Sequence, residues 1–138
     1  MKSSLIDTSV IVRYLVEDPQ NVSEKFKGVF PFFGKVEFAE IIVELPELVV
    51  FETFFVLTKL YQVPPKEAAK KLQILISLKG IIMHDKHLMQ SSLEILQSKR
   101  ISLVDSYILA TSQKKEIQSV YTYDSDFSKY GLKLLEIK

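Results

Sequence analysis

Short apolar runs alternate with stretches of helical periodicity along this sequence, and this alternation restricts its fold more than any other feature. The first apolar run, residues 4–6, ends at Asp7, and apolar residues then recur at helical spacing over 10–15. That pattern predicts a strand that leads directly into a helix. The helix is expected to end before Pro19, because a residue that precedes proline is pushed out of the α region.

The same succession is repeated downstream. Further strands are predicted at 36–43, where a short helix is the competing interpretation, and at 81–83, 120–122 and 132–137. Helices are predicted at 23–30, with a loop around Pro31 and Gly34 after it, and at 46–60, 66–78, 88–96 and 103–115; a turn or short helix is predicted at 124–130. This order predicts a single domain over residues 1–138, of the α/β class: a three-layer α/β/α sandwich with a mostly parallel central sheet of about four to five strands.

Composition excludes several classes of function. The 18 Lys and Arg nearly cancel the 17 Asp and Glu, so a role with nucleic acid has to rest on local charge. The absence of Cys excludes disulfides, thiolate nucleophiles and Cys-ligated metal sites. No apolar run approaches the roughly 20 residues of a membrane span, so we expect a soluble cytoplasmic protein without a membrane partner.

Four carboxylates lie among apolar residues. Asp7 and Asp124 each follow a predicted strand, whereas Glu52 and Asp105 lie on predicted helices with apolar residues one turn before and after them. An ionised carboxylate buried without a partner costs several kcal/mol, so such acids must be paired, neutralised or bound to metal. Each also has a structural interpretation: Asp7 and Asp124 can cap turns, and Asp105 can stabilise a helix start. Glu52, in mid-helix, gains nothing from the helix dipole.

Together the four acids could converge on one crevice, because sites in parallel sheets form beyond the carboxyl ends of the strands. Clustered carboxylates repel one another unless a divalent cation compensates, and Mg²⁺ and Mn²⁺ favour oxygen ligands. Such a site polarises a phosphoryl oxygen and lowers the pKa of bound water, which suits phosphodiester hydrolysis.

Four segments resemble the ordered acidic motifs of the PIN domain family, of the VapC type. They are LIDTSVIVRYLVEDP at 5–19, ELPELVVFETFFVLTKLYQVP at 44–64, SLVDSYILATSQKK at 102–115 and VYTYDSDF at 120–127. The resemblance implies a Mg²⁺- or Mn²⁺-dependent endoribonuclease that cleaves an RNA substrate. Such proteins are usually the toxin of a toxin–antitoxin pair and often homodimers, so an antitoxin protein and a second copy are the implied partners.

Carried over residue by residue, the resemblance assigns Asp7, Glu52, Asp105 and Asp124 to the catalytic and metal-binding quartet, with Thr8 and Ser9 supporting the metal site. Asp126 is the reserve for the fourth acid, and Glu44 or Glu47 could replace Glu52. Arg13, six residues after Asp7, is the nearest candidate for contact with RNA phosphates. Two other functions stay open: a weakly active or inactive PIN-fold module that binds RNA or protein, and a housekeeping RNA-processing nuclease.

Overall fold

The chain begins with a short strand that leads into a helix, as the alternation predicts. In the computed structural model, which describes residues 2–138, β1 (Ser4–Leu5) is followed closely by α1 (Thr8–Val16). The helix ends at Val16, and the backbone N–H of its capping residue Glu17 still donates to the carbonyl of Arg13 at 3.0 Å. Glu17 and Asp18 lead into Pro19, before which the sequence predicts the end of the helix.

The other elements follow mostly in the predicted order, and the strands are only two or three residues long. The helices are η1 (Glu24–Phe26), α2 (Val29–Glu37), α3 (Glu47–Lys59), α4 (Pro65–Ile76), α5 (Lys86–Ser98), α6 (Leu103–Lys115) and η2 (Ser125–Tyr130). The strands are β2 (Val43–Glu44), β3 (Ile81–Ile82), β4 (Ser119–Tyr121) and β5 (Lys133–Leu135).

All strand pairs are parallel, which confirms the predicted α/β class. The strands, however, form two separate sheets instead of one sheet of four to five strands. The first has the order β1-β2-β3, and the second pairs β4 with β5, with Val120 opposite Leu134. The division arises because β4 follows α6, and α6 packs against α5 instead of returning to the first sheet.

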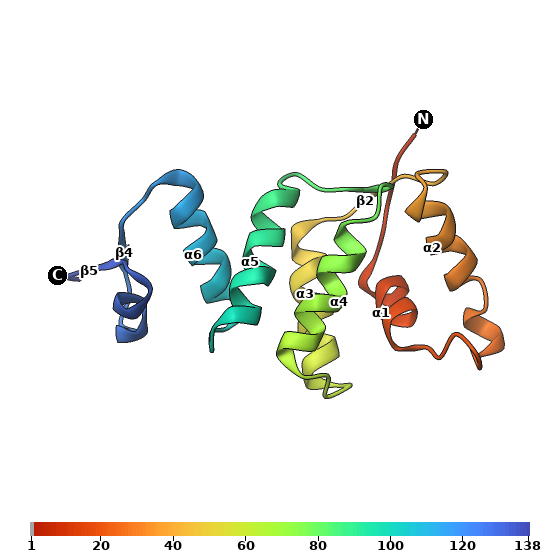
Figure 1. Cartoon of the computed structure of the whole chain (residues 1–138), viewed down its shortest axis with the longest axis horizontal. Coiled ribbons are helices and arrows are strands. Elements are labelled where there is room, and N and C mark those ends of the chain that lie inside the picture. Colours follow the sequence, from red (N-terminus) through yellow and green to blue (C-terminus); the bar gives the residue numbers. More distant parts are fainter. Residues whose placement is uncertain (1) are drawn as a thin grey trace.

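The helices lie side by side in an elongated arrangement from α2 at the N-terminal end to α6 near the C-terminal end (Figure 1). The main core lies between α1, α3, α4 and α5, and its fully buried side chains include Leu57, Leu72 and Leu93. A second, smaller cluster of buried side chains joins α6 to the C-terminal segments through Leu109, Phe127 and Leu132. Within residues 2–138, no helix is long and apolar enough to cross a membrane.

Two predictions between residues 23 and 43 are wrong. The predicted helix 23–30 is only the single turn η1, and α2 runs through Pro31 and Gly34 where a loop was expected. Proline is tolerated there because Pro31 lies in the first turn, where backbone N–H groups have no helical partner. The predicted strand 36–43 is helical at its start, which favours the competing interpretation, and only Val43 belongs to a strand. Ala39, with φ of 61°, turns the chain between the two.

Candidate functional site

Asp7 lies at the carboxyl end of β1 and caps α1. Its Oδ2 accepts hydrogen bonds from the hydroxyl of Ser9 at 2.7 Å and from the backbone N–H of Ser9 at 3.3 Å. The Ser9 hydroxyl is the main reason why the pKa of Asp7 is below its usual value. The side chain is exposed, so this carboxylate is ionised at neutral pH and accessible to a ligand.

Thr8 connects this end of the sheet to the second acid. Its side chain is buried, and its hydroxyl donates a hydrogen bond to Oε1 of Glu52 on α3. Glu52 itself is exposed, as are Leu48 and Phe55 one turn to either side of it. The expectation that this stretch of α3 faces inward is therefore wrong, because the buried face of α3 is the one that carries Val50, Phe54 and Leu57.

Asp7 and Glu52 line one open groove between α1 and α3, which we call the α1–α3 groove. Its volume is about 480 Å³, and its lining also includes Ser9, Arg13 and Tyr61. A second groove of about 820 Å³, the α1–α2 groove, lies on the other side of α1 and shares Asp7, Ser9 and Arg13 with the first. Asp7 therefore lines both grooves, whereas Glu52 lines only the α1–α3 groove.

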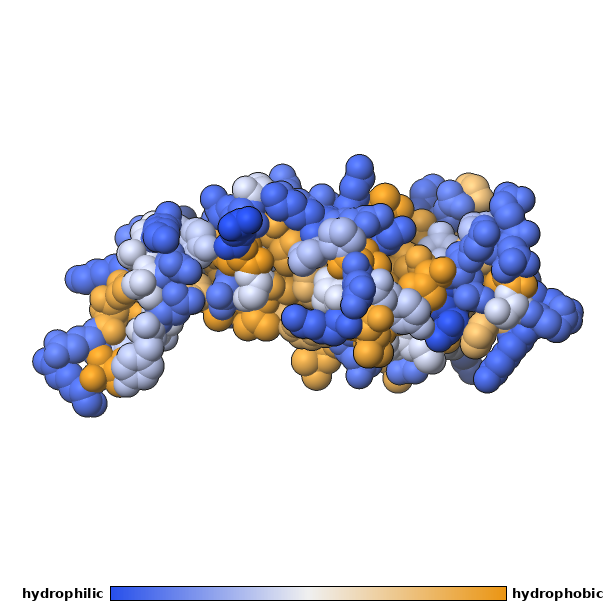
Figure 2. Space-filling model, turned by 90° about the horizontal axis from the view of Figure 1, so that it is seen from below, coloured by the Kyte–Doolittle hydropathy of each residue, from blue (hydrophilic) through white to orange (hydrophobic). Residues whose placement is uncertain are grey.

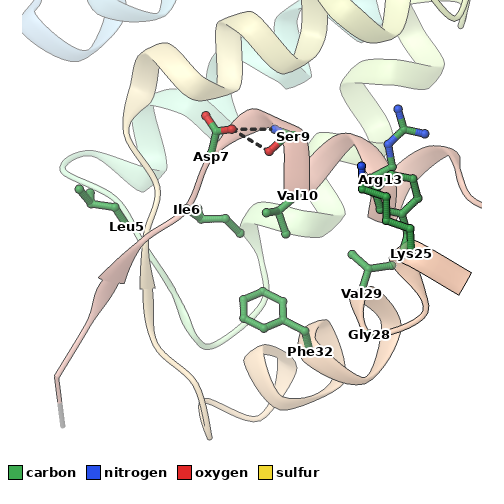
Figure 3. A pocket seen from close by; sticks show the side chains of 11 residues that line it. Leu5, Ile6, Asp7, Ser9, Val10, Arg13, Lys25, Gly28, Val29 and Phe32 are labelled. Atoms are coloured by element: carbon green, nitrogen blue, oxygen red, sulfur yellow. Dashed lines mark hydrogen bonds between the residues drawn. The ribbon is translucent and has the colours of Figure 1, made fainter.

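Arg13 supplies positive charge to both grooves. Its Nη2 donates to the hydroxyl of Tyr61 at 3.0 Å, and its guanidinium carbon lies 4.6 Å from the centre of the Phe26 ring. Lys25 lies near the same ring, with Nζ at 5.5 Å. Figure 3 shows Asp7 on one side of the α1–α2 groove and Arg13 with Lys25 on the other. Sequence reasoning missed Lys25, which lies outside the four motifs, and Tyr61, which lies in the second motif but is not one of its acids.

Asp105 and Asp124 do not line either groove. Asp105 is half-buried in the first turn of α6, where its backbone N–H donates to Oγ of Ser102 at 3.1 Å. Asp124 is exposed and caps η2, with Oδ1 accepting from the backbone N–H of Asp126 at 2.9 Å. Across residues 2–138, no three acidic or histidine side chains gather closely enough to hold a metal ion. One chain thus brings together two of the four predicted acids.

The alternative acids have other surroundings. Asp126 forms an ion pair with Lys129 at 3.2 Å. Glu44 is the last residue of β2, and Glu47, in the first turn of α3, accepts a hydrogen bond from the hydroxyl of Tyr107. Neither Glu44 nor Glu47 lines the α1–α3 groove. Of these three glutamates, Glu52 is therefore the one that lines a groove with Asp7.

Parallel strands with crossover helices define an α/β protein, and Asp7 beyond the carboxyl end of β1, with Glu52 of α3 in the same groove, marks its candidate site. The chain belongs to the PIN domain family, whose model matches residues 4–133. PIN domains are typically nucleases and generally use divalent metals. Among solved structures, the chain is similar to Mycobacterium tuberculosis VapC20, a toxin that cleaves the sarcin-ricin loop, with 20% identity and a TM-score of 0.38 over 94% of this chain and 96% of that one. No curated protein matches it.

Proposed function

We propose that this protein is a Mg²⁺- or Mn²⁺-dependent endoribonuclease that hydrolyses RNA phosphodiester bonds, and that it is the toxin of a toxin–antitoxin pair. The observation that carries the proposal is the position of Asp7. It is an exposed, ionised carboxylate at the carboxyl end of a parallel strand, and it shares a groove with a second carboxylate, Glu52. Membership of the PIN domain family supports the same chemistry.

The donor groups in the α1–α3 groove fit a divalent cation. Mg²⁺ in proteins is commonly held by one or two carboxylates, with water and substrate phosphate oxygens completing its shell. Asp7 and Glu52 would hold the ion, with Asp105 and Asp124 as further ligands where they are brought near. When bound, such an ion neutralises charge on the scissile phosphate and makes water a stronger nucleophile.

The residues around the acids have separate tasks in this proposal. Ser9 keeps Asp7 ionised and fixes its orientation through two hydrogen bonds, and Thr8 fixes that of Glu52. Arg13 and Lys25 would bind RNA phosphates, because both cations line the α1–α2 groove together with Asp7. Arg13 is already held by Phe26 and Tyr61, which reduces the side-chain entropy that is lost when it binds.

The direct test is cleavage of single-stranded and structured RNA by purified protein with Mg²⁺, Mn²⁺ or EDTA. We expect cleavage with metal, none with EDTA, and a loss of about 10²-fold or more for Asp7→Asn and Glu52→Gln. Glu94→Gln is the matched control, because Glu94 is an exposed acid on α5 outside both grooves. Undiminished cleavage in EDTA would overturn the proposal.

The toxin role needs a test in cells. Induced expression of the wild type should arrest growth, and Asp7→Asn should abolish the arrest although the protein accumulates to the same level. Co-expression of a small antitoxin protein encoded beside this gene should restore growth. A nuclease that cleaves RNA in vitro without arresting growth would instead be a housekeeping RNA-processing enzyme.

A second candidate function is an RNA- or protein-binding module without turnover. It is favoured by one observation: a single chain places only two of the four acids in the α1–α3 groove. Under this alternative, RNA binding survives in Asp7→Asn and EDTA, and no cleavage is detected with any divalent metal. Filter binding and cleavage assays on the same preparations distinguish the two.

A further inference from the structure

Within residues 2–138, the two sheets each leave a strand edge without a partner. β1 pairs with β2 on one side only, and the β4–β5 sheet consists of just two strands. Ser4 and Ile6 donate their backbone N–H groups toward β2, so the polar groups of Leu5 between them face the open edge. Parallel sheets are normally buried and have more than two strands, so both edges call for a covering strand.

The exposed surface of the chain is larger than its size requires. It amounts to 8888 Å², whereas a compact monomer of 15.9 kDa exposes about 7,400 Å². Two copies that each buried the excess of about 1,500 Å² would share an interface of about 3,000 Å² in total, which is the size of obligate dimer interfaces.

Apolar side chains lie on the surfaces that such an interface would cover. Figure 2 shows the C-terminal end projecting from the body of the molecule, with hydrophobic residues gathered along the middle. Leu48 and Phe55 on α3 are exposed on either side of Glu52, and Val104 and Ile108 are exposed beside Asp105 on α6. An open groove of about 300 Å³ lined by apolar residues such as Ile117 lies between α6 and β4.

The covering strand is β4 rather than β5. The residues of β4 are uncharged, whereas β5 begins with the exposed Lys133 and is followed by Glu136 and Lys138. Charged residues protect an edge strand from pairing, so the open edge of β4 is the one suited to a new partner. β1, with the exposed apolar side chain of Leu5, is equally unprotected.

Parallel pairing of β4 with β1 would place the predicted acids together. Asp7 follows the end of β1, and Asp124 follows the end of β4, so the two carboxylates would meet at one edge of the sheet. α6 and β4 run in opposite directions, and the first turn of α6, with Asp105, therefore lies toward the carboxyl end of β4 (Figure 1). If β4 pairs with β1, Asp105 and Asp124 are therefore both placed near Asp7.

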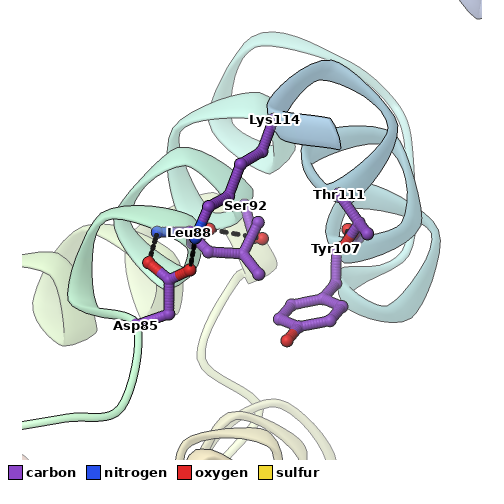
Figure 4. Close-up of polar contacts among 6 residues, drawn as sticks. All are labelled: Asp85, Leu88, Ser92, Tyr107, Thr111 and Lys114. Atoms are coloured by element: carbon purple, nitrogen blue, oxygen red, sulfur yellow. Dashed lines mark hydrogen bonds and ion pairs between the residues drawn. The ribbon is translucent and has the colours of Figure 1, made fainter. Parts of the chain in front are cut away.

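The packing of α6 opposes closure within one chain. Leu103 of α6 is buried in the main core, and α6 lies along α5. Nζ of Lys114 on α6 forms an ion pair with Asp85, which caps α5 (Figure 4). Only residues 116–118 connect α6 to β4, so β4 cannot reach its own β1 unless α6 leaves α5. A second copy can supply β4 while every one of these contacts is kept.

We propose that two copies of this chain exchange their C-terminal units, residues 103–138, so that β4 of each copy pairs in parallel with β1 of the other. Each catalytic site then consists of Asp7 and Glu52 from one copy and of Asp105 and Asp124 from its partner copy. This assignment of the sites rests on the proposed nuclease function, whereas the strand exchange itself does not.

The strand exchange is tested without any activity assay. The chain has no Cys, so Leu5→Cys and Tyr121→Cys introduce the only thiols. We expect light scattering to show a dimer, and a mixture of the two refolded single variants to form a disulfide-linked heterodimer on oxidation. Leu5→Cys mixed with Ile74→Cys, on the exposed face of α4, is the control that should stay unlinked. A monomeric double variant with an internal disulfide, or a monomeric wild type, would overturn the exchange.

The shared sites are tested by complementation. Asp7→Asn and Asp124→Asn, refolded together, should regain up to about half of the wild-type activity per heterodimer, because one of its two sites then carries no substitution. Asp7→Asn with Glu52→Gln is the control that should regain nothing, since both changes lie in the same half of the site. No recovery by the first pair, from an active wild type, would overturn the shared sites. An inactive wild type, with the Leu5→Cys and Tyr121→Cys variants still forming the intermolecular disulfide, would refute the nuclease proposal alone.

Discussion

The hydroxyl of Thr8 donates a hydrogen bond to the carboxylate of Glu52 and so ties the start of α1 to the middle of α3. Thr8 is buried next to Asp7, while the carboxylate that it holds is exposed in the α1–α3 groove. The contact therefore sets the position of one acid relative to the other. It links the first and second motifs of the sequence.

Replacement of Thr8 by Val should lower both nuclease activity and stability. The carboxylate of Glu52 loses its donor but stays hydrated, so we expect a loss of about 1 kcal/mol in the free energy of unfolding. Because Thr8 positions Glu52 rather than touching the substrate, the concentration of Mg²⁺ needed for half-maximal cleavage should rise. Thr8→Ser keeps the hydroxyl and should restore the Mg²⁺ requirement. Equal Mg²⁺ requirements for all three proteins would contradict this role.

Gly80 should not tolerate a side chain. A Cβ at this position would lie 2.6 Å from the carbonyl oxygen of Val36 and closer still to that of Ile41, and backbone atoms cannot swing away. We expect Gly80→Ala to cost about 1–3 kcal/mol of unfolding free energy in urea titrations. Gly34→Ala is the matched control, because nothing lies near its Cβ position on α2. That change should leave stability unaltered or raise it by up to about 1 kcal/mol.

The contribution of Tyr107 to stability should disappear at alkaline pH. Burial, together with the hydrogen bond to Glu47 and the charge of that residue, raises the pKa of Tyr107 to about 12 from its ordinary value of 10.0. The folded state thus keeps a proton that the unfolded state loses above pH 10. The stabilisation is complete below that pH and is lost as the pH rises toward 12. Unfolding free energies of the wild type and Tyr107→Phe should converge over this range, and parallel curves would contradict the assignment.

The ion pair between Asp85 and Lys114 should fasten α6 to α5 weakly. A double-mutant cycle with Asp85→Ala and Lys114→Ala should give a coupling free energy of about 0.5–1 kcal/mol that falls as salt is added. Asp85→Ala should cost about 1 kcal/mol more than Lys114→Ala, because Oδ1 of Asp85 also caps α5 through the N–H of Leu88. Lys115→Ala removes the same charge next to Lys114 and should show no coupling with Asp85.

The sequence predicts local structure well where two signals agree. At Asp7 the apolar run ends and helical spacing begins, and α1 starts there. The helix predicted at 103–115 is α6, and Ser102 caps it, with Oγ accepting from the N–H of Asp105. Prediction of local structure from the sequence fails where one residue type is found in two kinds of structure. Pro31 and Gly34 were assigned to a loop, but proline fits the first turn of a helix and glycine costs an exposed helix only about 1 kcal/mol.

The arrangement of the site is harder to predict because it depends on how elements pack. The apolar neighbours of Glu52 indicate that another segment packs on this face of α3, but they do not indicate which segment it is. In one chain Leu48 and Phe55 stay exposed, and Asp105 and Asp124 stay outside the α1–α3 groove. Strands of two or three residues carry too little pattern to specify their neighbours in a sheet, so the separation of β4 and β5 from β1 could not be foreseen.

The division of the predicted acids between two parts of the chain has a consequence for the order of synthesis. Asp7 and Glu52 leave the ribosome before Asp105 and Asp124. Under the proposed exchange, a chain that still lacks residues 103–138 cannot complete a site on another copy. Activity would begin only where a copy with a finished C-terminal unit has met another copy.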